Sequence, residues 1–555
     1  SVDFLFISAQ THFLKQYLLN RYSYDIQYAN NILDAVKHSL GTRNEYYGLP
    51  SSLCVKSLSF EPIADDFQVS LSKINEKEAR RKKEGVFYTD SDVTDFIVAN
   101  TFLHYAFPEE NKVYSFGDAY KKLLMARKDG ILKLLVANVF DPTCGAGEFL
   151  LSALSLKLRI NHDLHLTSDD VILESLCGND IEKTSTEISK IRLFFYALDS
   201  CDKNFDVIAL FNSLDSHFTN KDAVDYDGVS FYGKDIIIGN PPYIEYRNFS
   251  GHSRLNYGNV YADVLRYAVE SLNNSGIMAF VIPLSFVATL RMSAIREHIQ
   301  EMTDKQIVMN FADRPDSLFS SVHQKLTILI AQKDSHRNVV LSSGYNYWYQ
   351  DEREHLFHSI QVLPLDILKN DYWPKIGNKS EMSIFKKMDN FKGRSVLSII
   401  DKTDGDAIYL NQRGCFWMKA FTKNMNSNSY VPYYFPKTIT PFIFCLINSS
   451  LFFLLWIVIS DGWHVTNKEL SFVKIPKSVG NIAKWQELQN KLEDKLEATK
   501  VFVGTKQVDY EYKHKFCKDI IDEIDDQLAL VYKLSTSQLN YIKSFALKYR
   551  IGDGA

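Results

Sequence analysis

A short apolar stretch that ends in an amide, two prolines and an aromatic ring is the strongest candidate for chemistry: Asp235-Ile-Ile-Ile-Gly-Asn-Pro-Pro-Tyr243. The run Asp235–Ile238 is long enough for one buried strand, and the strand must stop at Pro241 and Pro242 because neither has an N–H to donate. Its end then presents the Asn240 side chain, backbone carbonyls and the Tyr243 ring, a set suited to holding a planar group that carries an amino function. For an isolated Asn-Pro-Pro sequence, a tight surface turn is the better interpretation.

A glycine turn follows a second apolar run. Ile131–Phe140 predicts a buried strand, and Asp141-Pro-Thr-Cys-Gly-Ala-Gly147 comes directly after it. Glycine lets the backbone approach a ligand closely, and the helix expected next presents free N–H groups to it. Many turns of this kind carry Gly-x-Gly for packing alone. The third glycine of the dinucleotide fingerprint and a Gly-Lys-Ser/Thr sequence are both missing, which disfavours NAD and ATP phosphate sites.

Two more apolar runs are expected as strands of the same sheet. Ser175–Gly178 ends at Asn179-Asp180, and an acidic residue in this place binds ribose hydroxyls in a doubly wound sheet. Val207–Phe211 is expected as a third strand that ends at Asn212. Apolar runs alternate with helical segments as far as residue 332, which predicts an α/β fold with a mostly parallel sheet.

The residues ahead of these strands are expected to be mostly helical. Residues 1–75 show helical spacing without a motif, and the charged segment 76–84 is interpreted as a solvated helix or linker. It leads into Gly85-Val-Phe-Tyr88-Thr89, in front of a helix expected over Val93–Phe102 with Thr89 or Ser91 as its cap.

Length and composition indicate a globular protein. A chain of 555 residues with 46% apolar residues can hold two or three domains with real cores. Its seven cysteines contain no C-x-x-C pair, so neither a zinc site nor a disulfide framework is indicated, and a cytoplasmic location is expected. With a net charge of -4, any positive surface for nucleic acid must be local.

One segment approaches transmembrane length. Pro441–Ile459 is nearly all apolar, but Asn448 and two serines lie at its centre. We therefore expect a buried helix or helix-turn there, and no membrane association. The N-terminal sequence Ser1–Lys15 lacks the pattern of a secretory signal.

Taken in chain order, four motifs resemble those of γ-class S-adenosylmethionine-dependent DNA adenine-N6 methyltransferases of the restriction-modification type. They are Gly-Val-Phe-Tyr88-Thr89, Asp141-Pro-Thr-Cys-Gly-Ala-Gly147, Asn179-Asp180-Ile-Glu and Asn240-Pro-Pro-Tyr243. The resemblance covers about residues 75–335 and implies a Rossmann-like S-adenosylmethionine methyltransferase domain. It also implies methyl transfer to N6 of an adenine that is flipped out of double-stranded DNA.

The resemblance further implies a role for each motif residue. Tyr88 and Thr89 close over the methionine part of the cofactor, Asp141 and Gly145 line its amino-acid end, Asp180 holds the ribose, Ile181 packs on the cofactor adenine, and Asn212 lies near the exocyclic amine. Asn240, Pro241, Pro242 and Tyr243 form the target site. Phe319 is either a second aromatic against the target base or a buried core residue, and no metal is implied.

Direct transfer is the chemistry that these residues permit. The Asn240 side-chain oxygen and the Pro241 carbonyl can accept both N6 hydrogens, which favours a nitrogen lone pair aimed at the methyl group. Cytosine-C5 methylation is disfavoured because it needs a nucleophilic cysteine and the chain has no Pro-Cys dipeptide.

Four regions are expected in the chain: a helical N-terminal region (1–75), the catalytic domain (76–335), an α+β target-recognition domain (336–480) and C-terminal helices (481–555). Aromatic and basic residues interleave over 336–480, which suits phosphate and base contacts, although core packing explains any single aromatic equally well. No base-reading residue is assigned. In the C-terminal region, Ser535-Thr-Ser-Gln538 predicts a capping box.

Other functions stay open at this point. The same fold acts on RNA or on a protein glutamine amide, and the chain could instead be a non-catalytic or modification subunit that works with a separate nuclease or specificity subunit. The first 75 residues show no acidic-x-Lys metal cluster, so we expect methylation without cleavage by this chain.

Overall fold

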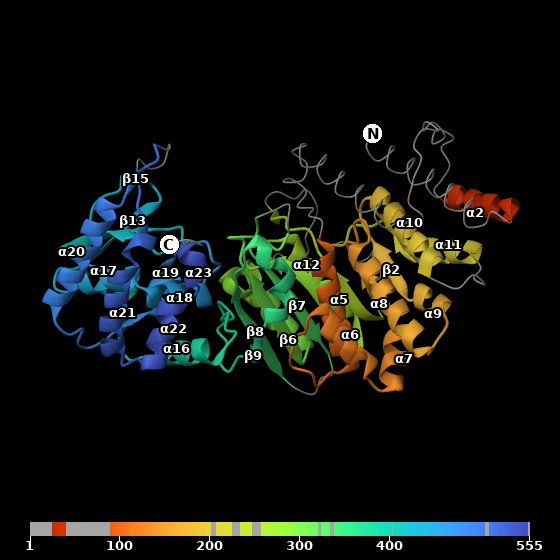
Figure 1. Cartoon of the computed structure of the whole chain (residues 1–555), viewed down its shortest axis with the longest axis horizontal. Coiled ribbons are helices and arrows are strands. Elements are labelled where there is room, and N and C mark those ends of the chain that lie inside the picture. The colour runs from red at the N-terminus through yellow and green to blue at the C-terminus, as the bar shows by residue number, and fades with distance from the viewer. Residues whose placement is uncertain are drawn as a thin grey trace.

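The computed structural model describes residues 25–39, 89–200, 207–224, 233–246, 257–319, 323–333, 338–401, 403–504 and 510–552 (Figure 1). Helix α2 (Ile26–Ser39) is the described part of the N-terminal region and agrees with the helical prediction there. Tyr88 and the charged segment 76–84 lie outside the described residues.

A nine-stranded sheet with the order β3-β2-β1-β4-β5-β7-β6-β8-β9 forms the centre of the first part of the chain. Its strands are β1 (Val139–Asp141), β2 (Leu176–Asn179), β3 (Phe218–Thr219), β4 (Lys234–Gly239), β5 (Leu272–Pro283), β6 (Lys305–Phe311), β7 (Leu326–Gln332), β8 (Val339–Asn346) and β9 (Val362–Pro364). Strands β1 to β5 pair in parallel, β7 runs antiparallel to β5 and β6, and β9 runs antiparallel to β8. The carboxyl ends of β1, β2, β4, β5, β6 and β8 therefore lie along one edge. This is the mostly parallel, Rossmann-like α/β sheet that the sequence predicts.

Helices cover the sheet and connect its strands. They are α5 (Ser91–Ala106), α6 (Phe116–Leu124), α7 (Lys128–Val136), α8 (Glu148–Leu164), α9 (Asp169–Glu174), α10 (Lys183–Ser200), α11 (Val207–Ser216), α12 (Val260–Ser271), α13 (Ser285–Ala288), α14 (Ser293–Met302) and α15 (Arg353–Ser359), with 3-10 turns η2 (Leu290–Met292) and η3 (Gln350–Glu352). Helix α5 is buried over most of its surface because it packs on α6, α8 and β5 together. Its N-cap is Asp90, so the prediction of Thr89 or Ser91 as the cap is wrong.

Two of the predicted strands are wrong because a short apolar run does not distinguish a strand from a buried helix. In the run Ile131–Phe140, the first six residues belong to α7, where Ile131, Leu134 and Leu135 are buried at helical spacing, and the strand is only Val139–Asp141. The run Val207–Phe211 is the first half of α11. The third strand is the two-residue β3, which is too short to give an apolar run.

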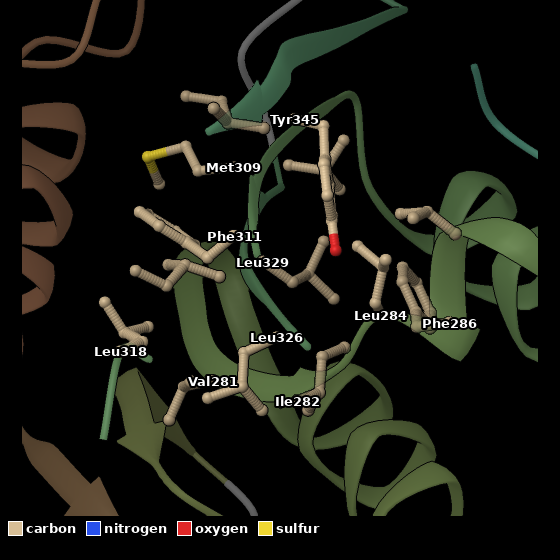
Figure 2. Close-up of a cluster of buried hydrophobic side chains, with 14 of the residues drawn as sticks. Val281, Ile282, Leu284, Phe286, Met309, Phe311, Leu318, Leu326, Leu329 and Tyr345 are labelled. Atoms are coloured by element: carbon tan, nitrogen blue, oxygen red, sulfur yellow. The ribbon is translucent and has the colours of Figure 1, made fainter. Parts of the chain in front are cut away.

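The sheet also continues past the predicted domain boundary at residue 335. Strand β8 pairs in parallel with β6, and β9 pairs with β8. The nine-stranded sheet therefore ends at Pro364. Figure 2 shows the apolar cluster on both faces of β5, β6, β7 and β8, with Phe311 and Leu326 on one face of the sheet and Ile282 and Tyr345 on the other. This cluster fixes the strand ends beside β4.

The second part of the chain combines small sheets with helices, as the α+β prediction states. Its strands are β10 (Arg394–Ser395) with β14 (Lys474–Ile475), the antiparallel sheet β12-β11-β13 (Ala420–Phe421, Gly405–Asn411 and Tyr430–Pro436), and β15 (Val501–Phe502) with β16 (Tyr510–Glu511). Its helices are α16 (Lys379–Asp389), α17 (Thr440–Asn448), α18 (Ser450–Ile459), α19 (Asn467–Phe472), α20 (Ile482–Ala498), α21 (Lys518–Tyr532), α22 (Thr536–Ser544) and α23 (Leu547–Ile551), with 3-10 turns η4 (Leu397–Ile399) and η5 (His514–Cys517). The C-terminal helices α20, α21 and α22 contact α17 or α18, so they share one core with the region before residue 480 (Figure 1). The capping box predicted at Ser535 is present at the start of α22.

The apolar segment near residue 450 forms a bent helix pair. Every residue of α17 and α18 is buried, which confirms the predicted helix-turn. Within the described ranges no single helix is long and apolar enough to cross a membrane, and only α17 and α18 together pass such a test, with a bend of 63° between them.

Candidate functional site

Three of the sequence motifs meet at the carboxyl edge of the sheet, around Asn240. This residue follows β4 directly, and its amide nitrogen Nδ2 donates to the Thr89 hydroxyl at 3.1 Å. The Thr143 hydroxyl, from the glycine loop, donates to the Asn240 backbone carbonyl at 3.4 Å. Thr89 is buried. The first motif and the glycine loop therefore both hold the Asn240 turn, and the turn is part of a site instead of an isolated surface feature.

The Tyr243 ring is anchored at its hydroxyl end. This hydroxyl donates to the Val281 carbonyl of β5 at 2.9 Å, and the ring meets Tyr261 of α12 edge-on with centroids 6.3 Å apart. Burial raises the pKa of Tyr243 well above its ordinary value, so the phenol stays protonated and keeps its donor. Pro241 is buried and Pro242 half-buried. The turn thus presents a ring whose orientation is set by β5 and α12.

The glycine loop approaches β4 very closely. Asp141 is buried at the end of β1, and a Cβ atom on Gly239 would lie 2.7 Å from its Oδ1 atom, so only glycine fits there. The same oxygen accepts from the Thr143 N–H at 3.0 Å. Burial, with the charge of Asp180 nearby, raises the pKa of Asp141 well above its ordinary value. A cationic ligand group beside this carboxyl would offset the free-energy cost of burying the charged carboxylate.

Both glycines of the loop have left-handed backbone conformations. Gly145 has φ 52° and Gly147, which caps α8, has φ 86°. A Cβ atom on Gly147 would lie 2.9 Å from the Ser189 hydroxyl oxygen of α10. Both the backbone angle and the space therefore require glycine at position 147, and the loop lies tightly between β1 and α10.

Asp180 holds the same loop from the end of β2. Its Oδ2 atom accepts from the Gly145 N–H and its Oδ1 atom from the Glu182 N–H, each at 2.9 Å. Burial raises the pKa of Asp180. The neighbouring Ile181 has 64% of its surface exposed, which is unusual for a large apolar residue and gives a planar ligand a face to pack on.

These features fit S-adenosylmethionine. The buried Asp141 carboxyl suits the ligand's ammonium group, the Asp180 carboxylate suits its ribose hydroxyls, and the exposed Ile181 suits its adenine ring. Among the described residues no group of His, Cys, Asp and Glu is placed to hold a metal ion.

Asn212 is not brought to this site by the fold. It lies exposed within α11, because the run that was expected as a strand is a helix. The residue that follows the real third strand is Asn220, whose amide nitrogen donates to the Asp180 carbonyl at 3.2 Å and to the Thr186 hydroxyl at 2.8 Å. Asn220 therefore holds the position after the third strand that was expected for Asn212. The feature of the sequence that could have identified Asn220 is its position directly after Phe218-Thr219.

Phe319 is buried, with 1% of its surface exposed. This exposure agrees with the core alternative, since a ring stacked on a base would need an open face. Its neighbours are tied to the first motif by Arg353, which the sequence did not single out. This guanidinium donates to the Ser317 and Leu318 carbonyls at 3.0 and 2.8 Å and forms ion pairs with Asp90 and Asp92. Arg353 thus links the segment of Phe319 to the residues that follow Thr89.

Comparison with known proteins finds a family that resembles part of this chain. The sheet and its glycine loop define a Rossmann-like methyltransferase fold. The sequence profile of the Eco57I restriction-modification methylase family matches residues 174–319, which include Asp180 and Asn240. This match confirms the resemblance to restriction-modification methyltransferases over that segment.

One relative and several solved structures extend the comparison. A stretch of 155 residues is 28% identical to the putative type II restriction enzyme and methyltransferase RM.MjaORFECS2P of Methanocaldococcus jannaschii. The match covers 22% of this chain and only 13% of that relative's length. Among solved structures, the Type IIL restriction-modification enzyme MmeI in complex with DNA is 13% identical with a TM-score of 0.49, covering 85% of this chain and 80% of that one. The DNA-bound Type ISP enzyme LlaBIII is 11% identical with a TM-score of 0.46, covering 99% of this chain and 51% of that one.

Proposed function

We propose that this chain is a site-specific DNA methyltransferase that moves a methyl group from S-adenosylmethionine to N6 of an adenine flipped out of double-stranded DNA. Its setting would be a restriction-modification or related system, with a nuclease or specificity subunit supplied by another protein. The observation that carries the proposal is the hydrogen bond from Asn240 to Thr89, beside a glycine loop that Asp180 holds. The Eco57I family match over residues 174–319 supports it.

Asn240 and Pro241 are the residues that prepare the target amine. The amine of adenine is a poor nucleophile because its lone pair is delocalised into the ring. Thr89 accepts from the amide nitrogen of Asn240, so the amide oxygen is the atom that would accept from a target base. That oxygen and the Pro241 carbonyl accept the two N6 hydrogens and favour a tetrahedral nitrogen.

Bound S-adenosylmethionine supplies an electrophilic methyl group on a sulfonium centre. Transfer would form the bond from N6 to the methyl carbon as the methyl–sulfur bond breaks, and the surplus N6 proton would leave to water. The chain's own work is to place the amine in line and to exclude competing orientations, which Asn240, Pro241 and the anchored Tyr243 ring do together.

Tyr243 is expected to contribute through its ring instead of its hydroxyl. Tyr243→Phe loses only the bond to the Val281 carbonyl, so transfer to DNA should fall by less than about tenfold. Tyr243→Ala loses the stacking surface, worth about 1–3 kcal/mol per base, and binding of the flipped base should weaken by about tenfold to a hundredfold. Single-turnover transfer to a duplex and 2-aminopurine fluorescence at the target base measure both effects. Equal rates for the alanine and phenylalanine variants would contradict a stacking role.

The function itself is tested by incubating the protein with methyl-labelled S-adenosylmethionine and genomic DNA, then mapping modified adenines by single-molecule sequencing. We expect label on N6 of adenine within one recurring sequence. Label on protein or RNA but not on DNA would sink the proposal and favour the alternatives with the same fold. A parallel digestion of plasmid with Mg²⁺ should give no fragments if cleavage belongs to a separate protein.

A further inference from the structure

A polar cavity in the second part of the chain lies at one end of the β12-β11-β13 sheet. Its volume is about 550 Å³, and its walls come from the residues that follow β11, the loop before β13 and the loop after α18. Gln412, Arg413, Ser427, Asn428 and His464 are among its lining residues. Among the residues that the structure describes, no Phe, Tyr, Trp, Asp or Glu side chain lines it. Amide, hydroxyl, imidazole and guanidinium groups are the groups that read the edges of DNA bases.

The backbone sets two of these side chains next to each other. The Gly414 N–H donates to the Trp463 carbonyl at 2.9 Å, and the Val465 N–H donates to the Gln412 carbonyl at 3.0 Å, which brackets an antiparallel bridge between Arg413 and His464. Residues opposite each other in such a pair extend to the same face. Arg413 and His464 therefore enter the cavity side by side.

Arg413 is not used for folding. Its side chain is exposed, and over the ranges that the structure describes it forms no ion pair with an acidic side chain. Arg353, in contrast, is partly buried and has two carboxylates and two carbonyls around it. A guanidinium left available at a polar cavity can bind O6 and N7 of guanine with two parallel hydrogen bonds.

The neighbouring groups are prepared for a ligand as well. The His464 Nδ1 atom lies 2.7 Å from Asp461 Oδ2, which fixes the ring and directs Nε2 away from Asp461. Asp461 also accepts from the N–H groups of Trp463 and His464, so its charge is satisfied within the loop. In the cavity wall, the Gln412 amide nitrogen is buried without a hydrogen-bond partner among the described residues. A ligand atom or water that reached this donor would recover the cost of leaving it unpaired.

The loop that carries His464 is held against the catalytic sheet. Lys325, just before β7, lies over the Trp463 ring at 4.6 Å and pairs with Asp313 at 2.8 Å. A Cβ atom on Gly462, whose φ is 69°, would lie 2.9 Å from the Tyr345 hydroxyl oxygen, so the loop approaches β8 closely. The start of β7 is beside the carboxyl ends of β5 and β6. The cavity thus belongs to a loop fixed at the same edge of the sheet as Asn240.

We infer that Arg413 reads a guanine in the DNA recognition sequence, with Gln412 and His464 contacting the same or the adjacent base pair. This assignment rests on the proposed function for its ligand, double-stranded DNA, and goes beyond it by naming residues that determine sequence specificity. A phosphate contact by Arg413 is the competing use of the same guanidinium.

A binding selection separates these uses without any methyl transfer. The wild-type chain, Arg413→Ala, Arg413→Lys and the control Arg394→Ala each select duplexes from a randomised library, and circular dichroism confirms folding. Arg394 is an exposed arginine on β10 that donates to a carbonyl outside the cavity. Arg413→Ala should lower the preference for guanine at one position by about tenfold to a hundredfold, with the other positions unchanged. Arg413→Lys should also lose most of the preference for guanine, because an ammonium group cannot form two parallel hydrogen bonds to O6 and N7.

Other outcomes are decisive in different ways. Uniformly weaker binding with an unchanged consensus, and a salt dependence reduced by about one counterion, would show a phosphate contact and overturn the inference. A wild-type chain that enriches no sequence would also overturn it. A clear consensus that depends on Arg413, together with no methylation of the selected duplex, would leave the inference standing and refute the proposed function.

Discussion

Replacing Asn240 with alanine is expected to lower the rate of methyl transfer to DNA by about 10²- to 10³-fold, the usual loss when a preorganised polar group at a reacting centre is removed. The affinity for S-adenosylmethionine should stay within about twofold, because the cofactor contacts assigned to Asp141 and Asp180 lie on other strands. The physical reason is the loss of the amide oxygen that accepts from N6. Single-turnover transfer to a duplex and calorimetric titration of the cofactor measure the two quantities separately.

Thr89→Val is the matched control for this prediction. It keeps the size of the buried side chain and removes only the hydroxyl that accepts from the Asn240 amide nitrogen. Without this bond the Asn240 side-chain amide is free to rotate. We therefore expect the transfer rate to fall by about tenfold, less than for Asn240→Ala. A wild-type rate in Asn240→Ala would remove Asn240 from the mechanism. If Asn240→Ala lost cofactor affinity by the same factor as transfer rate, Asn240 would instead support the fold of the site.

A site residue could be predicted from the sequence where the residues of its motif determine the local backbone conformation. The turn after β4 is such a case, because proline cannot continue a strand and Gly239 lets the end of β1 approach closely. Asp180 was also placed correctly at the end of β2. In both cases the chemistry of the motif residues fixes the backbone locally.

The third strand and its following residue show what a sequence pattern leaves out. A buried helix and a buried strand have the same apolar composition over five residues, so Val207–Phe211 gave the wrong element and with it Asn212. Strand β3 has two residues and exists only because it pairs with β2. Its hydrogen bonds are non-local, and no window of sequence contains them.

Contacts between segments that are distant in the sequence could not be predicted either. Arg353 joins the segment of Leu318 to Asp92, and the Trp463 loop joins the nine-stranded sheet to the second part of the chain. Both contacts span separations that local periodicity does not encode. The extension of the sheet to β8 and β9 has the same origin, since edge strands are defined by their partners. Several aromatic residues of the interleaved region 336–480, such as Trp348, Trp373 and Trp417, are buried core residues, as the core-packing alternative states.

Replacing Asp180 with alanine is expected to weaken binding of S-adenosylmethionine itself, by about tenfold to a hundredfold or more. A hydrogen bond to a charged group contributes about 1.5–3 kcal/mol, and the variant loses those to the ribose as well as the two that hold the Gly145 and Glu182 N–H groups. Methyl transfer at saturating cofactor should fall much less. Asp180→Asn keeps one acceptor oxygen and should lie between the wild type and the alanine variant.

The two roles of Asp180 can be separated by a cycle that changes the ligand and the residue together. The wild-type chain should bind an S-adenosylhomocysteine analogue without its ribose hydroxyls more weakly than S-adenosylhomocysteine, because the carboxylate loses its partners. In Asp180→Ala the two ligands should bind equally, since no carboxylate remains to distinguish them. If the variant still distinguishes them by the wild-type factor, the ribose is held elsewhere and Asp180 acts only through the Gly145 N–H. Unchanged affinity for S-adenosylmethionine in Asp180→Ala would exclude both roles, because either one requires the carboxylate to stabilise the bound state.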